Sequence, residues 1–303
     1  MSLPIKKFEQ PETSKATAVN LYPSQQKLTQ EQFKRISTFM EHTTGIKMPD
    51  SKLTMIQARL ANRLKALNFS DFSQYVNYVF SSDENAADEI TMMIDLLTTN
   101  LTHFFREKPH FDFLSSQVLP YLADEGISRP QLWSAGCSSG EEPYTLSIVM
   151  KEFMAANRGV FTDYSILATD ISTRILSKAV DAIYPLESVE KLPYDIKHKY
   201  FLKSKNPDKP YAKVKNEVRN KIHFDRLNFM DISFNIRPKK HIIFCRNVLI
   251  YFDKPTQLEV IRKLVDCLEV GGFLFLGHSE TIFGGNLPLR TVSTTVFQKT
   301  KEC

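Results

Sequence analysis

Residues 132–144 read LWSAGCSSGEEPY, and the expected architecture is built outward from this segment. Its first four residues are typical of a short buried strand, and Pro143 fits the first turn of a helix, where its missing N–H costs nothing. Gly136 and Gly140 bracket a turn whose backbone can approach a ligand closely, because no Cβ intervenes. Strand, glycine turn and helix in this order predict the first crossover of a doubly wound α/β sheet, in which ligands bind at the carboxyl ends of the strands. On the glycines alone, a simple tight turn in any α/β protein explains the segment equally well.

The pattern after residue 109 supports this Rossmann-like α/β fold, because helices and strands alternate. Strands are predicted at 132–135, 164–170, 222–227, 241–246 and 273–276, with helices at 111–122, 144–154 and 254–268 and another capped by Ser172. A last strand at 291–298 follows a connection too short for a crossover helix, so it is expected to be antiparallel. The irregular segment at about 184–220 contains two β-like pieces, 200–203 and 212–215, around a turn signal, and predicts a small inserted β-subdomain in the form of a hairpin.

The first hundred residues have a different pattern. Residues 1–27 are expected to form a flexible arm, and 28–97 an all-α domain with helices near 30–44, 51–67, 72–79 and 84–97. Residues 98–108 are polar, then aromatic, then charged, and are interpreted as a linker that contributes to the active site. The catalytic domain is predicted to span residues 109–303.

Composition excludes several classes of protein. The chain has 303 residues, 42% hydrophobic and 24% charged, with no apolar run that could span a membrane and no signal-peptide core. Its four cysteines are far apart and form no CxxC pair, which argues against a zinc site or disulfide framework and predicts a reducing, cytoplasmic location. The segment from Lys203 to Arg226 contains eight basic and three acidic residues, and the difference, 8 − 3 = +5, equals the net charge of the chain. This patch is either a solvated edge or a surface that attracts an acidic partner.

Acidic residues near the predicted strand ends indicate the class of ligand. Asp170 ends the second strand, where a carboxylate commonly binds the two ribose hydroxyls of a nucleoside. Glu141 and Glu142 open the helix after the glycine turn, and acids at that place repel a pyrophosphate. S-adenosylmethionine has a ribose, a sulphonium and an ammonium but no phosphate, so the site chemistry favours it over NAD.

Five motifs then resemble one family, the CheR chemotaxis-receptor methyltransferases, and they follow one another in the family's order at suitable spacing. They are NLTHFFR at 100–106, SGEEPY at 139–144, ATDI at 168–171, FCRNVLIYF at 244–252 and GHSE at 277–280. The similarity covers nearly all of the chain after about residue 28. The departures are mild: Gly136-Cys137 replaces other small residues, and His103 occupies a variable position.

The resemblance implies a protein-glutamate O-methyltransferase. Its substrates would be S-adenosylmethionine and glutamate side chains on the cytoplasmic signalling helices of chemoreceptors, and its products glutamyl methyl esters and S-adenosylhomocysteine. Arg106 would hold the substrate carboxylate and Tyr251 would orient it. The cofactor site is implied to contain Asn100, Thr102, Arg106, Glu142, Asp170, Asn228, Phe229, Arg246 and Asn247. No metal is expected, Cys137 is interpreted as a small turn residue, and His278 as part of a turn near the sheet end.

The resemblance suggests a function for two basic features of the sequence. Lys52, Arg59 and Arg63 lie at spacings of seven and four on one predicted helix, so they share a stripe that could bind an acidic receptor helix. The lysine-rich insertion resembles the family's receptor-docking subdomain. A monomer without nucleic acid or membrane insertion is expected. Two alternatives stay open at this point: a cofactor-binding regulatory adaptor that does not methylate receptors, and a methyltransferase for small molecules.

Overall fold

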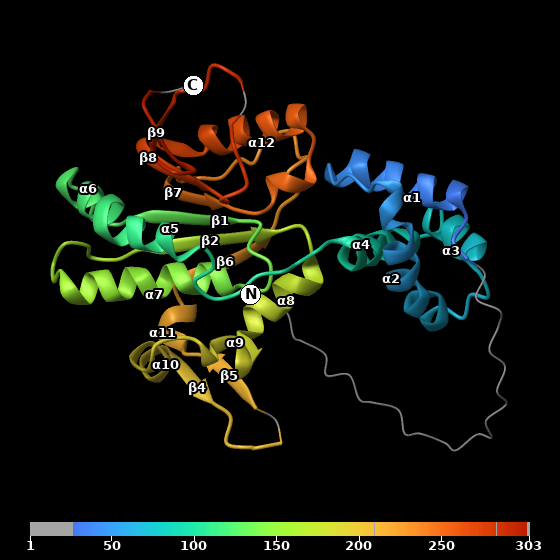
Figure 1. The fold of residues 1–303 in the computed structure, drawn as a ribbon, viewed down its shortest axis with the longest axis horizontal. Coiled ribbons are helices and arrows are strands. Elements are labelled where there is room, and N and C mark those ends of the chain that lie inside the picture. The colour runs from blue at the N-terminus through green and yellow to red at the C-terminus, as the bar shows by residue number, and fades with distance from the viewer. Residues whose placement is uncertain (1–26, 209, 283, 302–303) are drawn as a thin grey trace.

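A computed structural model describes residues 27–208, 210–282 and 284–301 (Figure 1). The predicted arm therefore lies, except for Lys27, outside the described residues. The part that follows is all-helical, with α1 at Gln30–Thr44, a 3₁₀ turn η1 at Asp50–Lys52, α2 at Leu53–Ala66, α3 at Phe72–Val79 and α4 at Ala86–Leu97. Thr29 and Gln32 form a capping box at the start of α1, and Gly45 ends it with a φ of 72°. The apolar faces of these helices meet in one core that includes Ile36, Ile56, Leu60, Tyr75 and Met93.

The remaining chain forms an α/β unit around a seven-stranded sheet of order β6-β2-β1-β7-β8-β10-β9. The neighbouring strands from β6 to β8 are parallel, whereas β10 is antiparallel to β8 and to β9. The strand bounds are β1 Gln131–Ala135, β2 Ser165–Asp170, β6 Ile222–Arg226, β7 Lys240–Cys245, β8 Leu268–Leu276, β9 Leu289–Ser293 and β10 Val296–Lys299. The doubly wound sheet predicted from the glycine turn is confirmed.

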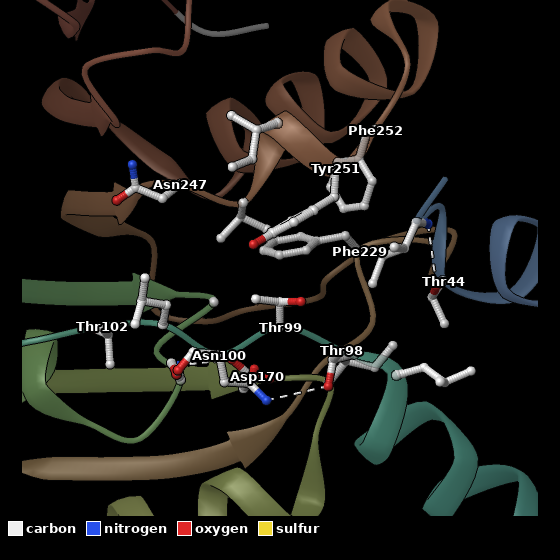
Figure 2. Close-up of a pocket in the computed structure, with 18 of the residues that line it drawn as sticks. Thr44, Thr98, Thr99, Asn100, Thr102, Asp170, Phe229, Asn247, Tyr251 and Phe252 are labelled. Carbon is white, nitrogen blue, oxygen red and sulfur yellow. Dashed lines mark hydrogen bonds between the residues drawn. The ribbon is translucent and has the colours of Figure 1, made fainter. Parts of the chain in front are cut away.

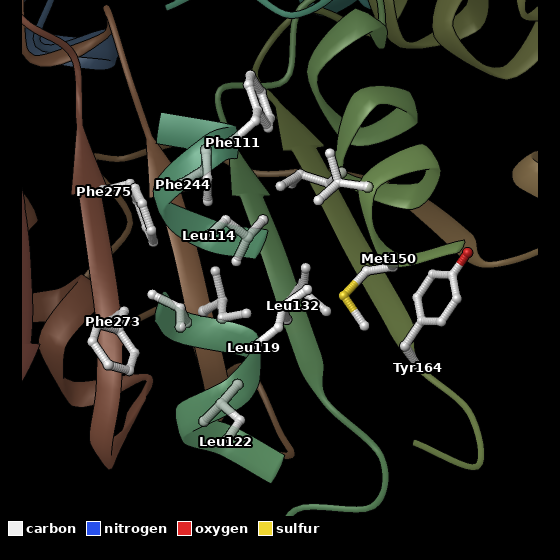
Figure 3. Close-up of a cluster of buried hydrophobic side chains, with 14 of the residues drawn as sticks. Phe111, Leu114, Leu119, Leu122, Leu132, Met150, Tyr164, Phe244, Phe273 and Phe275 are labelled. Atoms are coloured by element: carbon white, nitrogen blue, oxygen red, sulfur yellow. The ribbon is translucent and has the colours of Figure 1, made fainter. Parts of the chain in front are cut away.

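Helices cover both faces of this sheet, which explains why its central strands are apolar throughout. One face packs against α7 (Glu141–Ala156) and a continuous helical segment made of α5 (Lys108–Phe113), the π-helical turn η2 (Leu114–Val118) and α6 (Leu119–Asp124) (Figure 3). There the Phe244 and Phe275 rings stack with centroids 4.2 Å apart. The opposite face packs against α12 (Lys254–Asp266). Trp133, on that second face, is fully buried and donates from its indole N–H to the Thr169 hydroxyl.

Two strand predictions are corrected. The single last strand expected at 291–298 is a hairpin, because Thr295 adopts a φ of 55° and turns the chain between β9 and β10. The inserted hairpin is a three-stranded antiparallel sheet of order β3-β5-β4, because Ile183–Pro185 forms an additional strand, β3, beside β5. Its other elements are α9 Glu187–Glu190, α10 Tyr194–Tyr200, β4 Phe201–Lys203, β5 Tyr211–Val214 and α11 Asn216–Arg219.

The helical part lies beside the carboxyl edge of the main sheet (Figure 1). The Asn228 amide, just after β6, donates to the carbonyl of Thr43 in α1 at 2.7 Å. The Asp95 carboxylate, in α4, accepts from the Thr173 hydroxyl at 2.9 Å, at the start of α8 (Thr173–Asp181). Both contacts join the two parts next to the strand ends where a ligand is expected. Every helix in the described part of the chain is too short or too polar to cross a lipid bilayer.

Candidate functional site

A cavity of about 340 Å³ opens between the helical part and the carboxyl edge of the sheet (Figure 2). Its walls come from α1, α2, the linker after α4, the glycine turn and the segments that follow β2, β6 and β7. Tyr251 lines this cavity. So do all nine residues predicted for the cofactor site: Asn100, Thr102, Arg106, Glu142, Asp170, Asn228, Phe229, Arg246 and Asn247. The structure thus brings together residues up to 151 positions apart in the sequence, from Asn100 to Tyr251.

The glycine turn forms the floor of this cavity. Gly136 has a φ of 83°, and its backbone N–H and that of Cys137 both donate to the carbonyl of Thr169 on the neighbouring strand. A Cβ at Gly136 would overlap the side chain of Val248. Burial raises the pKa of the Cys137 thiol well above its usual value, so this cysteine is a neutral turn residue, as interpreted from the sequence.

Asp170, the residue expected to bind a ribose, lies at the cavity wall with its carboxylate fixed by backbone hydrogen bonds. Its two carboxylate oxygens accept backbone N–H groups from Ser138 (2.9 Å) and Ser172 (3.0 Å), which fix its orientation at the cavity wall. A carboxylate can accept more hydrogen bonds than these, so Asp170 is able to accept from the hydroxyl groups of a ribose as well. Burial raises the pKa of Asp170, and the hydrogen bonds from Ser172 and Ser138 oppose that rise. An acidic acceptor at this place is compatible with the ribose of S-adenosylmethionine.

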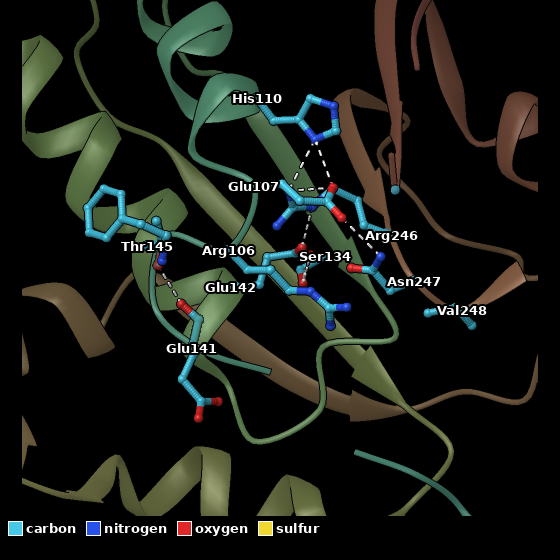
Figure 4. A network of polar contacts seen from close by, with 12 residues as sticks. Arg106, Glu107, His110, Ser134, Glu141, Glu142, Thr145, Arg246, Asn247 and Val248 are labelled. Carbon is cyan, nitrogen blue, oxygen red and sulfur yellow. Dashed lines mark hydrogen bonds and ion pairs between the residues drawn. The ribbon is translucent and has the colours of Figure 1, made fainter. Parts of the chain in front are cut away.

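Glu142 belongs to a buried ionic network (Figure 4). Its carboxylate accepts from the Ser134 hydroxyl at 2.7 Å and from Arg246 Nε at 2.8 Å. Arg246 also donates from Nη1 to the Glu107 carboxylate at 3.4 Å and to His110 Nδ1 at 3.1 Å. Burial opposes ionisation of Glu107, but the Asn247 hydrogen bond and the Arg246 charge outweigh it and hold its pKa below the usual value. Burial and the same arginine lower the pKa of His110 to about 4, so this histidine is neutral.

The same network contains three groups of metal-ligand type. Oxygen and nitrogen atoms of Glu107, His110 and His278 lie within 4.8 Å of one another. The Arg246 guanidinium, however, already occupies the acceptor atoms that a cation would need on Glu107 and His110. A second positive charge there would be repelled, so we interpret the cluster as a hydrogen-bond network.

Glu141 corrects part of the argument from the sequence. Glu141 and Glu142 together were the reason to expect a ligand without phosphate, but Glu141 does not line the cavity and instead accepts from the Ser139 hydroxyl at 2.6 Å. Its carboxylate points away from Glu142 (Figure 4). On a helix, residues one position apart point in different directions, and only one of the pair can face the ligand. The preference for a ligand without phosphate rests on Glu142 alone.

Arg106, in the linker after α4, and Tyr251, in the segment after β7, both line the cavity. Arg106 uses Nη1 to donate to the carbonyl of Leu101 at 2.8 Å, which leaves its other guanidinium donors without a hydrogen-bond partner in the described chain. Its neighbours Phe105 and Glu107 have φ values of 55° and 54°, a strained backbone that recurs at functional sites. The Tyr251 hydroxyl points into the cavity and has no hydrogen-bond partner among the described residues (Figure 2). Burial raises its pKa, against the lowering effect of the Arg106 charge, so the phenol keeps its proton and can donate it.

Two of the three residues of the predicted basic stripe form hydrogen bonds or ion pairs within the helical part. Lys52 is exposed at the cavity rim. Arg59 donates from Nη1 to the carbonyls of Leu96, Leu97 and Thr98, at 2.9 to 3.2 Å, and so caps the end of α4. Arg63 binds the buried Glu89 carboxylate, with its closest contact at 2.5 Å. These contacts give both arginines a structural role, and receptor docking by the stripe stays a prediction.

The lysine-rich patch of the insertion is partly engaged as well. Lys215 donates to the carbonyl of His198, Arg219 to that of Val180, and Lys221 to the Asp163 carboxylate. Lys209 lies outside the described residues. Lys203 and Lys205 are exposed.

Sequence reasoning missed three residues of the site: Glu107, His110 and Glu280. The Glu280 carboxylate accepts the backbone N–H groups of Gly277, Asn247, Val248 and Leu249 at 2.6 to 3.0 Å. Glu280 belongs to the GHSE motif, so a signal was present, but the partners that define its contribution lie more than thirty positions away.

Two family profiles match the chain. The profile "CheR methyltransferase, SAM binding domain" matches residues 100–298, and "CheR methyltransferase, all-alpha domain" matches residues 31–98. The chain belongs to the CheR methyltransferase family. It is 38% identical to the "Chemotaxis protein methyltransferase" of Borreliella burgdorferi over 276 residues, which cover 90% of this chain and 95% of that protein. It is 35% identical to "Chemotaxis protein methyltransferase 2" of Pseudomonas aeruginosa, over 89% of this chain and 93% of that protein. The CheR chain described here accordingly contains the family's binding domain for S-adenosylmethionine (SAM).

Proposed function

We propose that this CheR-family chain transfers the methyl group of S-adenosylmethionine to glutamate side chains on the cytoplasmic signalling helices of chemoreceptors, forming glutamyl methyl esters in the cytoplasm. One observation carries the proposal. Arg106 and Tyr251, whose side chains keep hydrogen-bond donors that no described residue uses, line the same cavity as the predicted cofactor residues. The names of the relatives, chemotaxis protein methyltransferases, support the receptor as the methyl acceptor.

The main task of the protein in this reaction is to place the acceptor carboxylate next to the methyl group. A glutamate side chain with a pKa near about 4.3 is ionised at cellular pH, so no general base is required. The bound cofactor supplies an electrophilic methyl group on a sulphonium. Arg106 binds the acceptor carboxylate through its free N–H groups, and the protonated Tyr251 hydroxyl donates to the same carboxylate and fixes its direction. Alignment of the two reactants in a site that excludes water supplies the rate enhancement.

A radiolabel assay tests this proposal. Purified protein, SAM labelled on its methyl group and receptor-bearing membranes should yield base-labile label on the receptor. Tyr251→Phe should lower kcat/KM by about 10–100-fold, because it removes one hydrogen bond to a charged group worth about 1.5–3 kcal/mol. Its affinity for S-adenosylhomocysteine should stay unchanged. Tyr121→Phe, at a half-buried tyrosine of α6 outside the cavity and outside the insertion, is the matched control and should have no effect.

The alternatives predict other results. Cofactor binding without label on the receptor would overturn the proposal and favour a regulatory adaptor. Label that appears only in small molecules of the membrane extract would identify a small-molecule methyltransferase. The described structure and the relatives contain no feature that favours either alternative over receptor methylation.

A further inference from the structure

The segment after β7 carries both a predicted cofactor residue, Asn247, and Tyr251. It leaves the sheet through Asn247, whose φ is 58°, and then forms the single 3₁₀ turn η3 (Leu249–Tyr251). The backbone N–H groups of Asn247, Val248 and Leu249 all point to the same side. Three successive N–H groups arranged in this way form a binding site for an anion.

Glu280 supplies that anion from within the chain. Its side chain is 4% exposed, with Oε1 accepting from Val248 and Leu249 (2.8 Å each) and Oε2 from Asn247 (3.0 Å). Oε2 also accepts the N–H of Gly277, at 2.6 Å, so the carboxylate makes four hydrogen bonds to backbone. Because the amides of Val248 and Leu249 are fixed, the direction in which the turn presents Tyr251 is fixed with them.

A second carboxylate, that of Glu107, contacts the same segment through the Asn247 side chain. The side-chain amide of Asn247 donates to Glu107 Oε1 at 3.0 Å, and the backbone N–H of His278 donates to Glu107 Oε2 at 3.2 Å. Glu107 directly follows Arg106. Asn247 is therefore bound through its backbone by Glu280 and through its side chain by the neighbour of Arg106.

Gly277 permits this close packing. A Cβ at this position would lie 2.8 Å from the backbone N of Asn247 and 2.8 Å from Glu280 Oε2. The turn at 277–280 can therefore approach the segment after β7 only without a side chain at its first residue.

We propose that Glu280 is a positioning residue for methyl transfer, which holds the turn that presents Tyr251 and, through Asn247 and Glu107, sets the place of Tyr251 relative to Arg106. The proposal rests on the function proposed above. Glu280 does not line the cavity and acts only through the residues it holds. Glu280→Gln keeps the size of the side chain but replaces one acceptor oxygen with an N–H₂ group that faces two backbone donors.

The decisive experiment is a double-mutant cycle in the receptor methylation assay, with Glu280→Gln, Tyr251→Phe and the double variant. Glu280→Gln should lower kcat by about 10–100-fold with a smaller change in the receptor KM, because the turn loses charge-assisted hydrogen bonds. If Glu280 acts through Tyr251, the phenylalanine substitution costs about 10–100-fold in the wild type but less than about threefold in the glutamine background. Equal costs in both backgrounds overturn the proposal.

The control is Glu89→Gln, which alters another buried carboxylate, 3% exposed, in the helical part of the chain. It should lower the melting temperature yet leave kcat per folded molecule and the cost of Tyr251→Phe unchanged. If Glu280→Gln behaves in the same way, Glu280 is merely structural.

A second measurement does not depend on activity. Nitration of Tyr251 at pH 8, followed by mass spectrometry of its peptide, should be several-fold faster in Glu280→Gln than in the wild type or Glu89→Gln, because the ring is no longer held. Equal rates overturn the inference even if the wild-type protein methylates receptors, whereas faster nitration without methylation would fault the proposed function alone. If Glu280→Gln does not fold, Gly277→Ala displaces the same turn without a change of charge and should give the same two results.

Discussion

Substitution of Arg63 by methionine should destabilise the chain, and the structure allows the size of the effect to be worked out. The Glu89 side chain is 2% exposed, and Arg63 binds both of its oxygens. Removing the arginine leaves a buried carboxylate whose one remaining side-chain partner among the described residues is the Tyr75 hydroxyl, at 3.1 Å. Loss of one partner of a buried ion pair costs about 3–5 kcal/mol. Because the Arg63 side chain is 28% exposed, water can partly replace it, and we expect the lower end, about 3 kcal/mol.

Urea denaturation of the full chain, followed by circular dichroism at 222 nm, measures this change. Arg63→Met should lower the free energy of unfolding by about 3 kcal/mol in the transition that unfolds the helical part. The double variant Arg63→Met, Glu89→Gln should recover at least half, because no unpaired charge is then buried. A loss below about 1 kcal/mol, together with a higher KM for receptor, would refute the reasoning and show that Arg63 serves docking instead. Lys52→Glu, at an exposed lysine, is therefore the cleaner probe of docking by the stripe.

Three further predictions concern the site. The pKa of His110 is about 4 in the folded chain and near 6.5 in the unfolded chain, so the free energy of unfolding should fall as the pH drops between these values. His110→Gln should abolish about 3 kcal/mol of that loss, as measured by urea titrations at pH 7 and pH 4. Gly136→Ala should weaken S-adenosylhomocysteine binding at least about tenfold in calorimetry, because the new Cβ meets Val248 and the backbone has φ 83°. Lys263 donates to the carbonyls of Phe229 and Asp231, so Lys263→Met should weaken cofactor binding more than it lowers kcat, and equal effects would contradict a role at that loop.

Local signals in the sequence were sufficient for the fold, whereas most of the residues expected around the cavity came from the resemblance to the CheR family. The glycine turn at 136–140 and the apolar strands each carry their own signal, and parallel strands bring their carboxyl ends to one edge. Those ends bring Asp170 and the segment with Asn247 to one edge, while the linker with Arg106 was expected there only from the resemblance. The elements missed were those with weak local signals. β3 has only three residues and includes a proline, and the turn before Val296 uses Thr295 rather than glycine.

The ionic contacts could not be predicted from the sequence for a different reason. Arg63 pairs with Glu89, 26 positions away, and Glu280 with amides about 31 to 33 positions away. Helical spacing places Lys52, Arg59 and Arg63 on one stripe, but it does not say whether that stripe faces solvent or the neighbouring helix. In this chain α4 lies beside α2 and takes both arginines, so a surface inferred from charge alone includes side chains that hold the helices together.

The cavity takes its walls from two parts of the chain, with Thr44 and Met48 on the helical side and Asp170 and Phe229 on the sheet side. A molecule bound there fastens the two parts to each other, and a ligand at about 100 times its dissociation constant adds about 2.7 kcal/mol to that attachment. The empty protein should then melt in two calorimetric transitions and the saturated protein in one. S-adenosylhomocysteine, the product expected from the proposed function, should hold the two parts together in the same way if it binds in this cavity, so product release would be coupled to their separation.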